Sequence, residues 1–291
     1  MNMWLVGAGY WGSKLLAGLD KIGVKGQVID IRNGQTIDDI TDHGPVMLAT
    51  PLWQHHEQTI ALLKRGHDVY VEKPMAETAK QIQAIQQSLS DNQLLMVGHI
   101  FVYHPQMLLI KDLIKSGEVG TVQHITSRRL NWGIYQTKTS PILSLATHDI
   151  SIVSELTGTD CVVSQAQGHV LSGGSQFDRV QFSGQSGKTL FDIDVSWCWP
   201  IRTRETVIIG TTGQIVWDQD ANKVLLFNNR IENNRAVATD PVVYEYNYNL
   251  SPLEYELQHW VDCVETRLHP MTGAPQALSV AHTIDQVQTL L

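Results

Sequence analysis

The sequence opens with a Gly-x-Gly-x-x-Gly pattern at Gly7, Gly9 and Gly12. The pattern follows the apolar segment 3–6 and precedes an apolar segment, 13–19, with helical spacing. In this context the first glycine makes a tight turn, the second lets the backbone approach a pyrophosphate, and the third lets the helix pack on the strand. The pattern therefore predicts a dinucleotide site at the start of a parallel sheet, although the spacing alone also fits an ordinary strand-turn-helix unit.

An acidic residue at the end of the next expected strand strengthens this prediction. Asp30 follows the expected strand residues Gln27-Val28-Ile29, about twenty residues after the glycines, where such sites bind the ribose hydroxyls. We therefore expect NAD as the cofactor. Arg32 lies close enough in the sequence to bind a 2′-phosphate, so NADP is the alternative.

Residues 1–121 alternate short apolar segments with amphipathic ones, which is typical of a doubly wound parallel sheet covered by helices on both faces. The expected strands are 4–6, 28–31, 46–49, 68–71 and 94–97, and the expected helices are 12–19, 55–65, 78–90 and 104–116. Between Asp30 and Thr50 the chain is too short for a full helix as well as a strand, so we expect a turn at 36–40.

Residues 122–291 show a series of strands separated by turn signals. The expected strands are 122–130, 162–170, 179–183, 189–197, 204–210, 213–217 and 223–227, and the expected helices are 141–156, 254–266 and 274–291. Ser140 is the expected N-cap of the first helix, and the Asn-rich segment 228–240 is expected to be a surface loop. The sequence thus predicts an α/β chain: a doubly wound nucleotide-binding domain over 1–121 and an α+β domain with a large, mostly antiparallel open sheet over 122–291.

The composition excludes several classes of function. The formal net charge is -8 and no Lys/Arg run is present, which argues against nucleic acid or an anionic membrane as partner. No apolar run reaches the roughly 18 residues of a membrane span. We see no signal peptide and expect a cytoplasmic location. The cysteines at 161, 198 and 263 are scattered, so we expect reduced thiols and no metal site.

Two expected strands of the first domain end in residues that suit ligand contact. Ligands in such sheets bind beyond the carboxyl ends of the strands, which places Thr50, Pro51, Leu52 and His55 against the cofactor, unless they form an ordinary connection to the next helix. The segment Glu72-Lys73-Pro74 ends the following strand. A lysine there can position a substrate hydroxyl and influence proton movement, whereas a surface lysine beside a turn proline is the alternative.

A histidine near the start of the second domain's first helix is a candidate general base. His148 shares a helical face with Ser144, four residues before it, and an imidazole titrates near neutrality. A core or surface histidine is the alternative. Asp149 points away from His148 around the helix, so it is not a simple orienter of the imidazole. The aromatic and arginine-containing segment 196–202 suits a sugar ring or phosphates, or else a packed strand end or an oligomer face.

Together these motifs resemble the glucose-fructose oxidoreductase / inositol dehydrogenase (Gfo/Idh/MocA) family of NAD(P)-dependent oxidoreductases. The resemblance covers nearly the whole chain and is carried by 6–12, 49–51, 71–74, 97–99, 148–149 and the closing helices. It implies an N-terminal Rossmann domain, and a C-terminal domain whose open sheet face commonly forms a homodimer or homotetramer interface. Within the family the chain is most similar to the UDP-N-acetylglucosamine or UDP-N-acetylglucosaminuronate 3-dehydrogenase branch, through 98–105, 129–133, 148–151, 196–200, 256–260 and 270–273.

The resemblance implies that Lys73 and His148 are the catalytic pair. The expected cofactor contacts are Gly7, Gly9, Tyr10, Trp11, Gly12, Asp30, Arg32, Thr50, Pro51, Leu52, His55, Glu72, Lys73 and Pro74. The expected substrate contacts are Tyr103, Asn131, Ser144 and Arg202.

Two positions depart from the family pattern: Ser144 stands where many relatives have aspartate, and Thr147 where the closer branch has proline. The first change removes a carboxylate from the catalytic cluster. We therefore expect an NAD(P)-dependent dehydrogenase of a sugar or sugar nucleotide. Two other functions remain open: a non-catalytic regulatory protein that binds the cofactor, which Ser144 favours, and a reductase of a non-sugar carbonyl or imine compound on the same fold.

Overall fold

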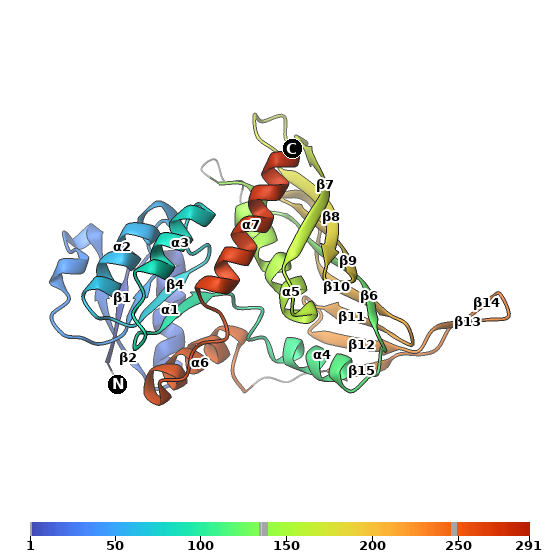
Figure 1. Cartoon of the computed structure of the whole chain (residues 1–291), viewed down its shortest axis with the longest axis horizontal. Coiled ribbons are helices and arrows are strands. Elements are labelled where there is room, and N and C mark those ends of the chain that lie inside the picture. Colours follow the sequence, from blue (N-terminus) through green and yellow to red (C-terminus); the bar gives the residue numbers. More distant parts are fainter. Residues whose placement is uncertain (1, 134, 136–138, 246–248) are drawn as a thin grey trace. The chain divides into compact units, whose positions relative to one another are not determined.

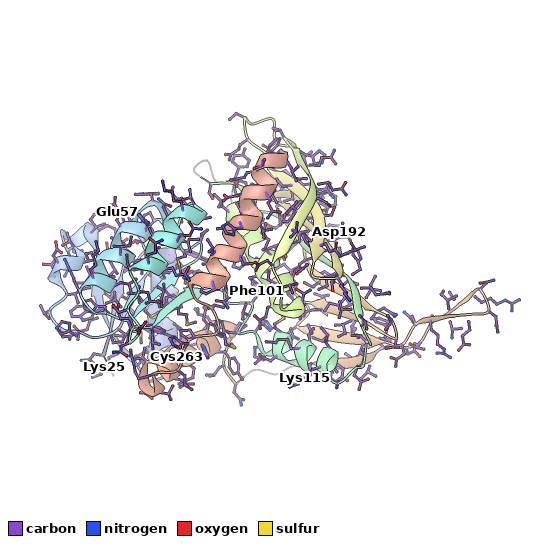
Figure 2. All side chains as sticks on the ribbon, viewed as in Figure 1. Lys25, Glu57, Phe101, Lys115, Asp192 and Cys263 are labelled. Carbon is purple, nitrogen blue, oxygen red and sulfur yellow. The ribbon has the colours of Figure 1, made fainter. Side chains whose placement is uncertain are left out.

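The computed structural model of the chain describes residues 2–133, 135, 139–245 and 249–291. The chain forms two compact units (Figure 1), the first made of Met1–His104 and Asn249–His282 and the second of Pro105–Tyr248 and Thr283–Leu291. Figure 2 draws their side chains, with Glu57 labelled in the first unit and Asp192 in the second. This division differs from the predicted boundary after residue 121, because the chain enters the second unit earlier and later returns to the first.

The first unit is built on a five-stranded parallel sheet with the order β2-β1-β3-β4-β5. Its strands are β1 Asn2–Val6, β2 Lys25–Ile29, β3 Val46–Leu48, β4 Val69–Glu72 and β5 Leu95–Gly98. Its helices are α1 Tyr10–Lys21, α2 Leu52–Lys64, α3 Ala79–Gln87 and α6 Pro252–Thr266, with the short helices η1 Ile31–Asn33 and η2 Ile37–Asp39 after β2. The doubly wound sheet and the short turn at 36–40 are therefore confirmed.

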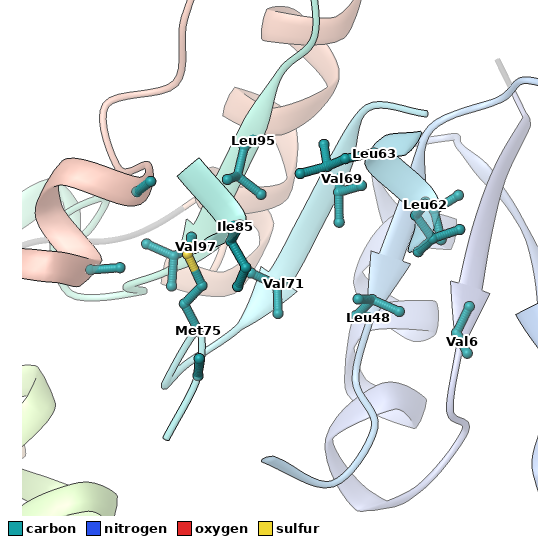
Figure 3. Close-up of a cluster of buried hydrophobic side chains, with 14 of the residues drawn as sticks. Val6, Leu48, Leu62, Leu63, Val69, Val71, Met75, Ile85, Leu95 and Val97 are labelled. Carbon is teal, nitrogen blue, oxygen red and sulfur yellow. The ribbon is translucent and has the colours of Figure 1, made fainter. Parts of the chain in front are cut away.

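Apolar side chains fill both faces of this sheet. Figure 3 shows one cluster, in which Val6, Leu48, Val71 and Val97 from four strands gather with residues such as Leu62 of α2. Alternate strand residues point to the other face and pack with α1 and α6. Burial on both faces explains why β1, β3, β4 and β5 are mostly apolar in sequence.

The helix α6 explains why the chain returns to the first unit. Leu257, Trp260 and Val261 on α6 are buried in the same cluster as Leu5 and Met47 of the parallel sheet. An amphipathic helix takes most of its stability from packing of its apolar face. This face packs on a sheet that ended more than 150 residues earlier, and no local pattern in the sequence indicates such a partner.

The second unit contains an eight-stranded sheet with the order β15-β12-β11-β10-β6-β9-β8-β7 (Figure 1). Its strands are β6 Val122–Trp132, β7 Cys161–His169, β8 Arg179–Ser186, β9 Thr189–Ser196, β10 Cys198–Gly210, β11 Gln214–Asp218, β12 Lys223–Phe227 and β15 Val242–Glu245. Its helices are α4 Pro105–Lys115, η3 Ile142–Ala146 and α5 Thr147–Thr157, and α7 Ala274–Leu290 runs into it from the first unit. Over the described residues, the β6–β9 pair is parallel and the other neighbours are antiparallel, as predicted.

The prediction of a loop over 228–240 is wrong, because this segment contains the hairpin of β13 Arg230–Glu232 and β14 Arg235–Val237. Asn233 and Asn234 at its tip have φ values of 50° and 62°. Two-residue hairpin turns need positive φ at both central positions, and asparagine tolerates this conformation. The strand residues are almost all exposed, so no alternation of buried and exposed side chains marks them in the sequence. Among the described residues, no helix has the length and apolar character needed to cross a membrane.

Candidate functional site

The three glycines pack as their predicted roles require. Gly7 has a φ of +93°, and a Cβ there would lie 2.8 Å from Ala49 O. A Cβ on Gly12 would lie 1.9 Å from Gly7 O, so α1 can approach β1 only without a side chain at this position. A Cβ on Gly9, by contrast, would meet no atom within 4 Å. The first and third glycines thus serve chain packing, and the second leaves open space at the N-terminus of α1.

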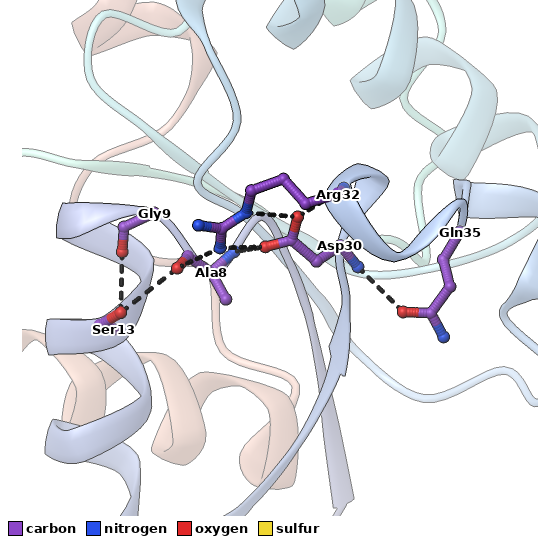
Figure 4. Close-up of polar contacts among 6 residues, drawn as sticks. All are labelled: Ala8, Gly9, Ser13, Asp30, Arg32 and Gln35. Atoms are coloured by element: carbon purple, nitrogen blue, oxygen red, sulfur yellow. Dashed lines mark hydrogen bonds and ion pairs between the residues drawn. The ribbon is translucent and has the colours of Figure 1, made fainter.

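Asp30 fixes the glycine loop to the end of β2 (Figure 4). Its Oδ2 accepts the Ala8 N–H at 2.9 Å, and its Oδ1 accepts the Arg32 N–H and Nε–H, both at 2.9 Å. Arg32 Nη2 also donates to Ala8 O at 2.7 Å. Hydrogen bonds from Arg32 lower the pKa of Asp30 far below its usual range, so the carboxylate is ionised. A ribose hydroxyl would share this carboxylate with Arg32, and the predicted ribose contact stays a prediction.

A cavity of about 420 Å³ opens at the carboxyl ends of β1, β2 and β3. Among the predicted residues it is lined by Gly7, Gly9, Asp30, Arg32, Thr50 and Pro51. Sequence reasoning missed its other contacts, which include Ile31, Gln35, Thr36, Ile37, Gln54 and Gln58. These residues belong to no motif, and the short connection after Asp30 is the signal that could have found most of them. Polar and apolar walls at this edge of a doubly wound sheet suit an adenosine group.

The remaining predicted cofactor contacts at helix starts lie outside the lining of this cavity. Tyr10 and Trp11 begin α1, where Lys14 Nζ lies 4.4 Å and 5.1 Å from the centres of their rings. Leu52 begins α2 and is half-buried. His55 is buried, and its Nδ1 and Nε2 each lie 2.8 Å from a backbone oxygen, of Pro74 and Thr50 respectively. Because both of its nitrogens face carbonyl groups, His55 ties the loop after β3 to the loop after β4.

Glu72, at the end of β4, has its carboxyl group in the interior of the first unit. Tyr70 Oη lies 3.0 Å from Glu72 Oε1 and 3.2 Å from Glu256 Oε2 on α6, and all three residues are buried. A Cβ on Gly98 would lie 2.4 Å from Tyr70 Oη, so this glycine makes room for the cluster. A hydroxyl has one hydrogen and donates it once, so the second short contact needs a proton on a carboxyl group.

The two carboxyl groups differ in how they titrate. Burial raises the pKa of Glu72 to about 7, although the Tyr70 hydroxyl and the charge of Lys73 oppose this rise. Burial and the neighbouring charge of Glu72 raise the pKa of Glu256 well above its usual range. Glu256 therefore keeps its proton at neutral pH, while Glu72 titrates there.

Lys73 directly follows Glu72, and its charge acts both on Glu72 and on His99, the residue after β5. It is half-buried, and the peptide bond to Pro74 is cis. Burial lowers the pKa of His99 to about 3, and the charge of Lys73 adds to this effect. His99 is thus neutral, and Lys73 places a cation at the same edge of the parallel sheet as the cavity.

Tyr103 lies in the interior of the first unit and is 3% exposed. Its Oη lies 2.6 Å from Thr272 Oγ1 and accepts the Thr272 N–H at 3.2 Å. The hydroxyl therefore joins the segment after β5 to the segment before α7, and the expected substrate contact of Tyr103 stays a prediction.

His148 lies in the first turn of α5, directly after the π-helical segment η3. Ser140 Oγ accepts the Leu143 N–H at 3.3 Å at the start of this segment, as the predicted cap requires. Ser144 belongs to η3 and His148 to the turn that follows it, and their predicted common face stays a prediction. Single π-helical turns occur frequently at functional sites.

Asp149 anchors α5 to β6. Arg129 donates from Nε to Asp149 Oδ2 at 2.9 Å and from Nη2 to Oδ1 at 3.1 Å, and Ser127 Oγ donates to Oδ1 at 2.7 Å. The side chains of this ion pair are 2% and 0% exposed. Asn131 is half-buried near the end of β6, and the largely exposed Arg202 on β10 donates from Nε to Asp220 Oδ1 at 2.8 Å.

Lys73 belongs to the first unit and His148 to the second; their joint action on one substrate stays a prediction. Within the described residues, no group of three or more His, Cys, Asp or Glu side chains is arranged to hold a metal ion.

A doubly wound sheet with a glycine loop, an acid after β2 and a cavity at the strand ends defines a dinucleotide-binding protein. Two family models match the chain, "Oxidoreductase family, NAD-binding Rossmann fold" over residues 27–99 and "GFO/IDH/MocA C-terminal domain" over residues 107–216. The chain therefore belongs to the Gfo/Idh/MocA family of oxidoreductases, and its cofactor is NAD.

Solved structures with this fold include sugar dehydrogenases. A UDP-N-acetylglucosamine 3-dehydrogenase, GnnA from Acidithiobacillus ferrooxidans, has a TM-score of 0.81 and 18% identity, with 100% of this chain and 97% of that chain covered. A levoglucosan dehydrogenase in complex with NADH and levoglucosan has a TM-score of 0.83 and 17% identity, with 100% and 96% covered. At these identities the likeness concerns the fold.

Sequence relatives are more diverse. A 4-carboxy-2-hydroxymuconate-6-semialdehyde dehydrogenase of Sphingobium sp. is 29% identical over an alignment of 147 residues. The match covers 42% of this chain and 46% of that protein. A 2,7-anhydro-N-acetylneuraminate hydratase of Mediterraneibacter gnavus is 27% identical over 146 residues, 44% of this chain and 39% of that protein. The chain thus spans less than half the length of each of these relatives.

Proposed function

We propose that this protein is a dehydrogenase that transfers hydride between NAD and a ring hydroxyl, or the matching ketone, of a sugar or sugar nucleotide. One observation carries the proposal: Lys73 directly follows the buried acid Glu72 at the carboxyl-end edge of the parallel sheet, the edge at which the cavity opens. The solved sugar dehydrogenases with this fold support the substrate class.

In this proposal, the chain's own residues bind the sugar and move its proton. Lys73 donates a hydrogen bond to the reacting oxygen, and an ionised Glu72 beside it keeps the ammonium group protonated. His148 accepts the hydroxyl proton, because an imidazole titrates near the working pH. The buried Arg129–Asp149 pair holds α5, and with it His148, against β6.

The test is turnover of NAD with a panel of free sugars, sugar acids, UDP-sugars and a semialdehyde. On a true substrate, Lys73→Met and His148→Asn should each lower kcat by about 10²–10⁴-fold, the usual contribution of a proton-transfer group, and His148→Asn should keep the NAD affinity of the wild type. Lys80→Met, at an exposed lysine on α3, is the matched control and should keep full activity. Normal turnover by both site variants would contradict the proposed roles.

A non-catalytic protein that keeps the cofactor site is the second candidate, and Ser144 is the observation that favours it. An aspartate facing His148 would raise the pKa of the imidazole, so Ser144→Asp should increase turnover if the protein is a slow dehydrogenase. NAD binding without turnover of any panel compound, by wild type and by this variant, would favour the binding protein.

A further inference from the structure

A row of hydrogen-bond donors crosses three strands of the second unit. Arg129 on β6 and Arg204 on β10 are direct partners across the strands. Gln219 follows β11, and its backbone N–H donates to Arg204 O at 2.9 Å. Two like charges directly opposite each other destabilise a sheet. Negative charge on the same face would therefore stabilise the pair formed by Arg129 and Arg204.

The carboxylates nearby neutralise two of the three arginines in this region. Asp149 forms the buried bidentate pair with Arg129, and Asp220 pairs with the exposed Arg202. Arg204 has no such partner: within residues 2–133, 135, 139–245 and 249–291 it forms no ion pair, and its Nε is buried without a hydrogen-bond acceptor. One positive charge in this row is therefore uncompensated.

Gln219 adds a second unsatisfied donor. Arg129 Nη1 donates to Gln219 Oε1 at 3.3 Å, which fixes the orientation of the amide and makes Nε2 the donor side. That Nε2 is buried, and the described part of the chain offers it no acceptor. Burial, together with the charges of Arg129 and Arg202, lowers the pKa of Arg204 to about 10, so the guanidinium is still charged at neutral pH. Buried donors left without acceptors are costly.

We propose that Arg204 and Gln219 bind an anionic oxygen group of the substrate, a phosphate or a carboxylate, so that the sugar this protein acts on is itself an anion. Planar guanidinium and amide donors match the oxygen pairs of such groups. This site is connected to the helix that carries His148. Asp149, the residue after His148, binds Arg129, and Arg129 lies opposite Arg204 in the sheet. The inference rests on the proposed function and refines it. Arg202 is expected from the sequence to contact substrate, but it is paired with Asp220. In this proposal Arg204 makes the substrate contact instead.

Binding of simple probes tests the site apart from turnover. Calorimetric titration would compare inorganic pyrophosphate and glucuronate with neutral glucose. Wild type should bind both anions, and Arg204→Gln should bind them at least about tenfold more weakly, the effect of losing a charged hydrogen bond. Arg204→Lys keeps the positive charge but loses the planar guanidinium group, so its anion affinity should lie between those of wild type and Arg204→Gln.

Arg128→Gln is the matched control, because Arg128 precedes Arg129 on β6 but is exposed and points to the opposite face. It should bind both anions as wild type does. Equal anion affinity in wild type and a folded Arg204→Gln protein would overturn the inference.

Kinetics separate this inference from the proposed function. With an anionic sugar, Arg204→Gln should raise KM at least about tenfold and leave kcat nearly unchanged, because the lost contact binds ground state and transition state alike. With a neutral sugar it should change neither. If only neutral sugars are oxidised, with the same KM in both proteins, the dehydrogenase stands and the anion site is overturned. If no sugar is oxidised but Arg204→Gln still loses anion binding, the anion site stands and the dehydrogenase fails.

Discussion

At the level of single residues, the glycine loop gives a pair of substitutions with opposite expected results. Gly9→Val should leave the protein folded, because a Cβ there meets no atom within 4 Å and φ is -69°. The added side chain should fill the space for the pyrophosphate and abolish NAD binding. Thermal denaturation and calorimetric titration with NAD would check both parts.

Gly12→Ala is the counterpart, and its Cβ would lie 1.9 Å from Gly7 O. It should destabilise the fold by at least about 1–3 kcal/mol, the usual cost of overpacking. A folded Gly9→Val protein that binds NAD normally would mean that the pyrophosphate does not lie at this loop.

The buried carboxyl group of Glu72 predicts how the stability of the fold depends on pH. Its pKa is raised from 4.5 to about 7, so its contribution to stability is complete below about pH 4.5 and is lost as the pH rises through about 7. At about 1.4 kcal/mol per pKa unit, a shift of this size corresponds to roughly 3 kcal/mol. Glu72→Gln cannot ionise, so its free energy of unfolding should depend less on pH over this range. Urea denaturation at a series of pH values measures the difference.

Glu77→Gln is the control for this experiment, because Glu77 is exposed five residues further along the chain. It should keep the pH dependence of the wild type. The same slope in wild type and Glu72→Gln would show that Glu72 does not hold a proton near neutrality.

At the level of helices and strands, α5 depends on one buried ion pair. Asp149→Asn would leave the guanidinium of Arg129 buried without its charge partner, and breaking such pairs costs about 3–5 kcal/mol. The free energy of unfolding should fall by about that amount, and kcat should fall as well because α5 carries His148. Ser127→Ala, which removes one hydrogen bond to the same carboxylate, should cost only about 1 kcal/mol. Equal, small losses in both variants would contradict an anchoring role for Asp149.

The elements themselves were largely predictable, and their partners were not. Alternation of apolar segments with helical ones marks the parallel sheet, because β1, β3, β4 and β5 are buried on both faces. The hairpin at 230–237 was missed because its strands are exposed. The π-helical segment that contains Ser144 was also missed, because the sequence there predicts a single continuous helix.

In the candidate site, too, some residues were predictable from local sequence and others were not. Gly9, Asp30 and Thr50 follow from local motifs, and they line the cavity. Glu256 approaches Tyr70 across 186 positions of sequence, and Arg204 matters only because it lies opposite Arg129. Contacts of this kind depend on strand order and on helix packing, which local patterns do not contain.

At the level of the whole molecule, the chain leaves an exposed row on the outer face of its second sheet. Leu190 on β9, His124 on β6 and Ile209 on β10 are partners across adjacent strands. Leu190 is 56% exposed and Ile209 is 38% exposed, and Asp192 Oδ2 lies 2.6 Å from His124 Nε2 beside them. A sheet face with central apolar side chains suits a second copy of the chain, as the family resemblance implies.

We therefore expect a homodimer or homotetramer in which this row is buried. Leu190→Arg would place a charge in the centre of the interface, where an unpaired buried charge is costly, so light scattering should show a shift towards the monomer. Leu268→Arg makes the same change at a position that is 68% exposed in the first unit, and it should leave the assembly intact. Because all the expected NAD contacts lie in the first unit, the dissociated Leu190→Arg protein should still bind NAD with wild-type affinity. A wild-type protein that is monomeric at all concentrations, or a Leu190→Arg protein that assembles normally, would place any interface elsewhere than on this row.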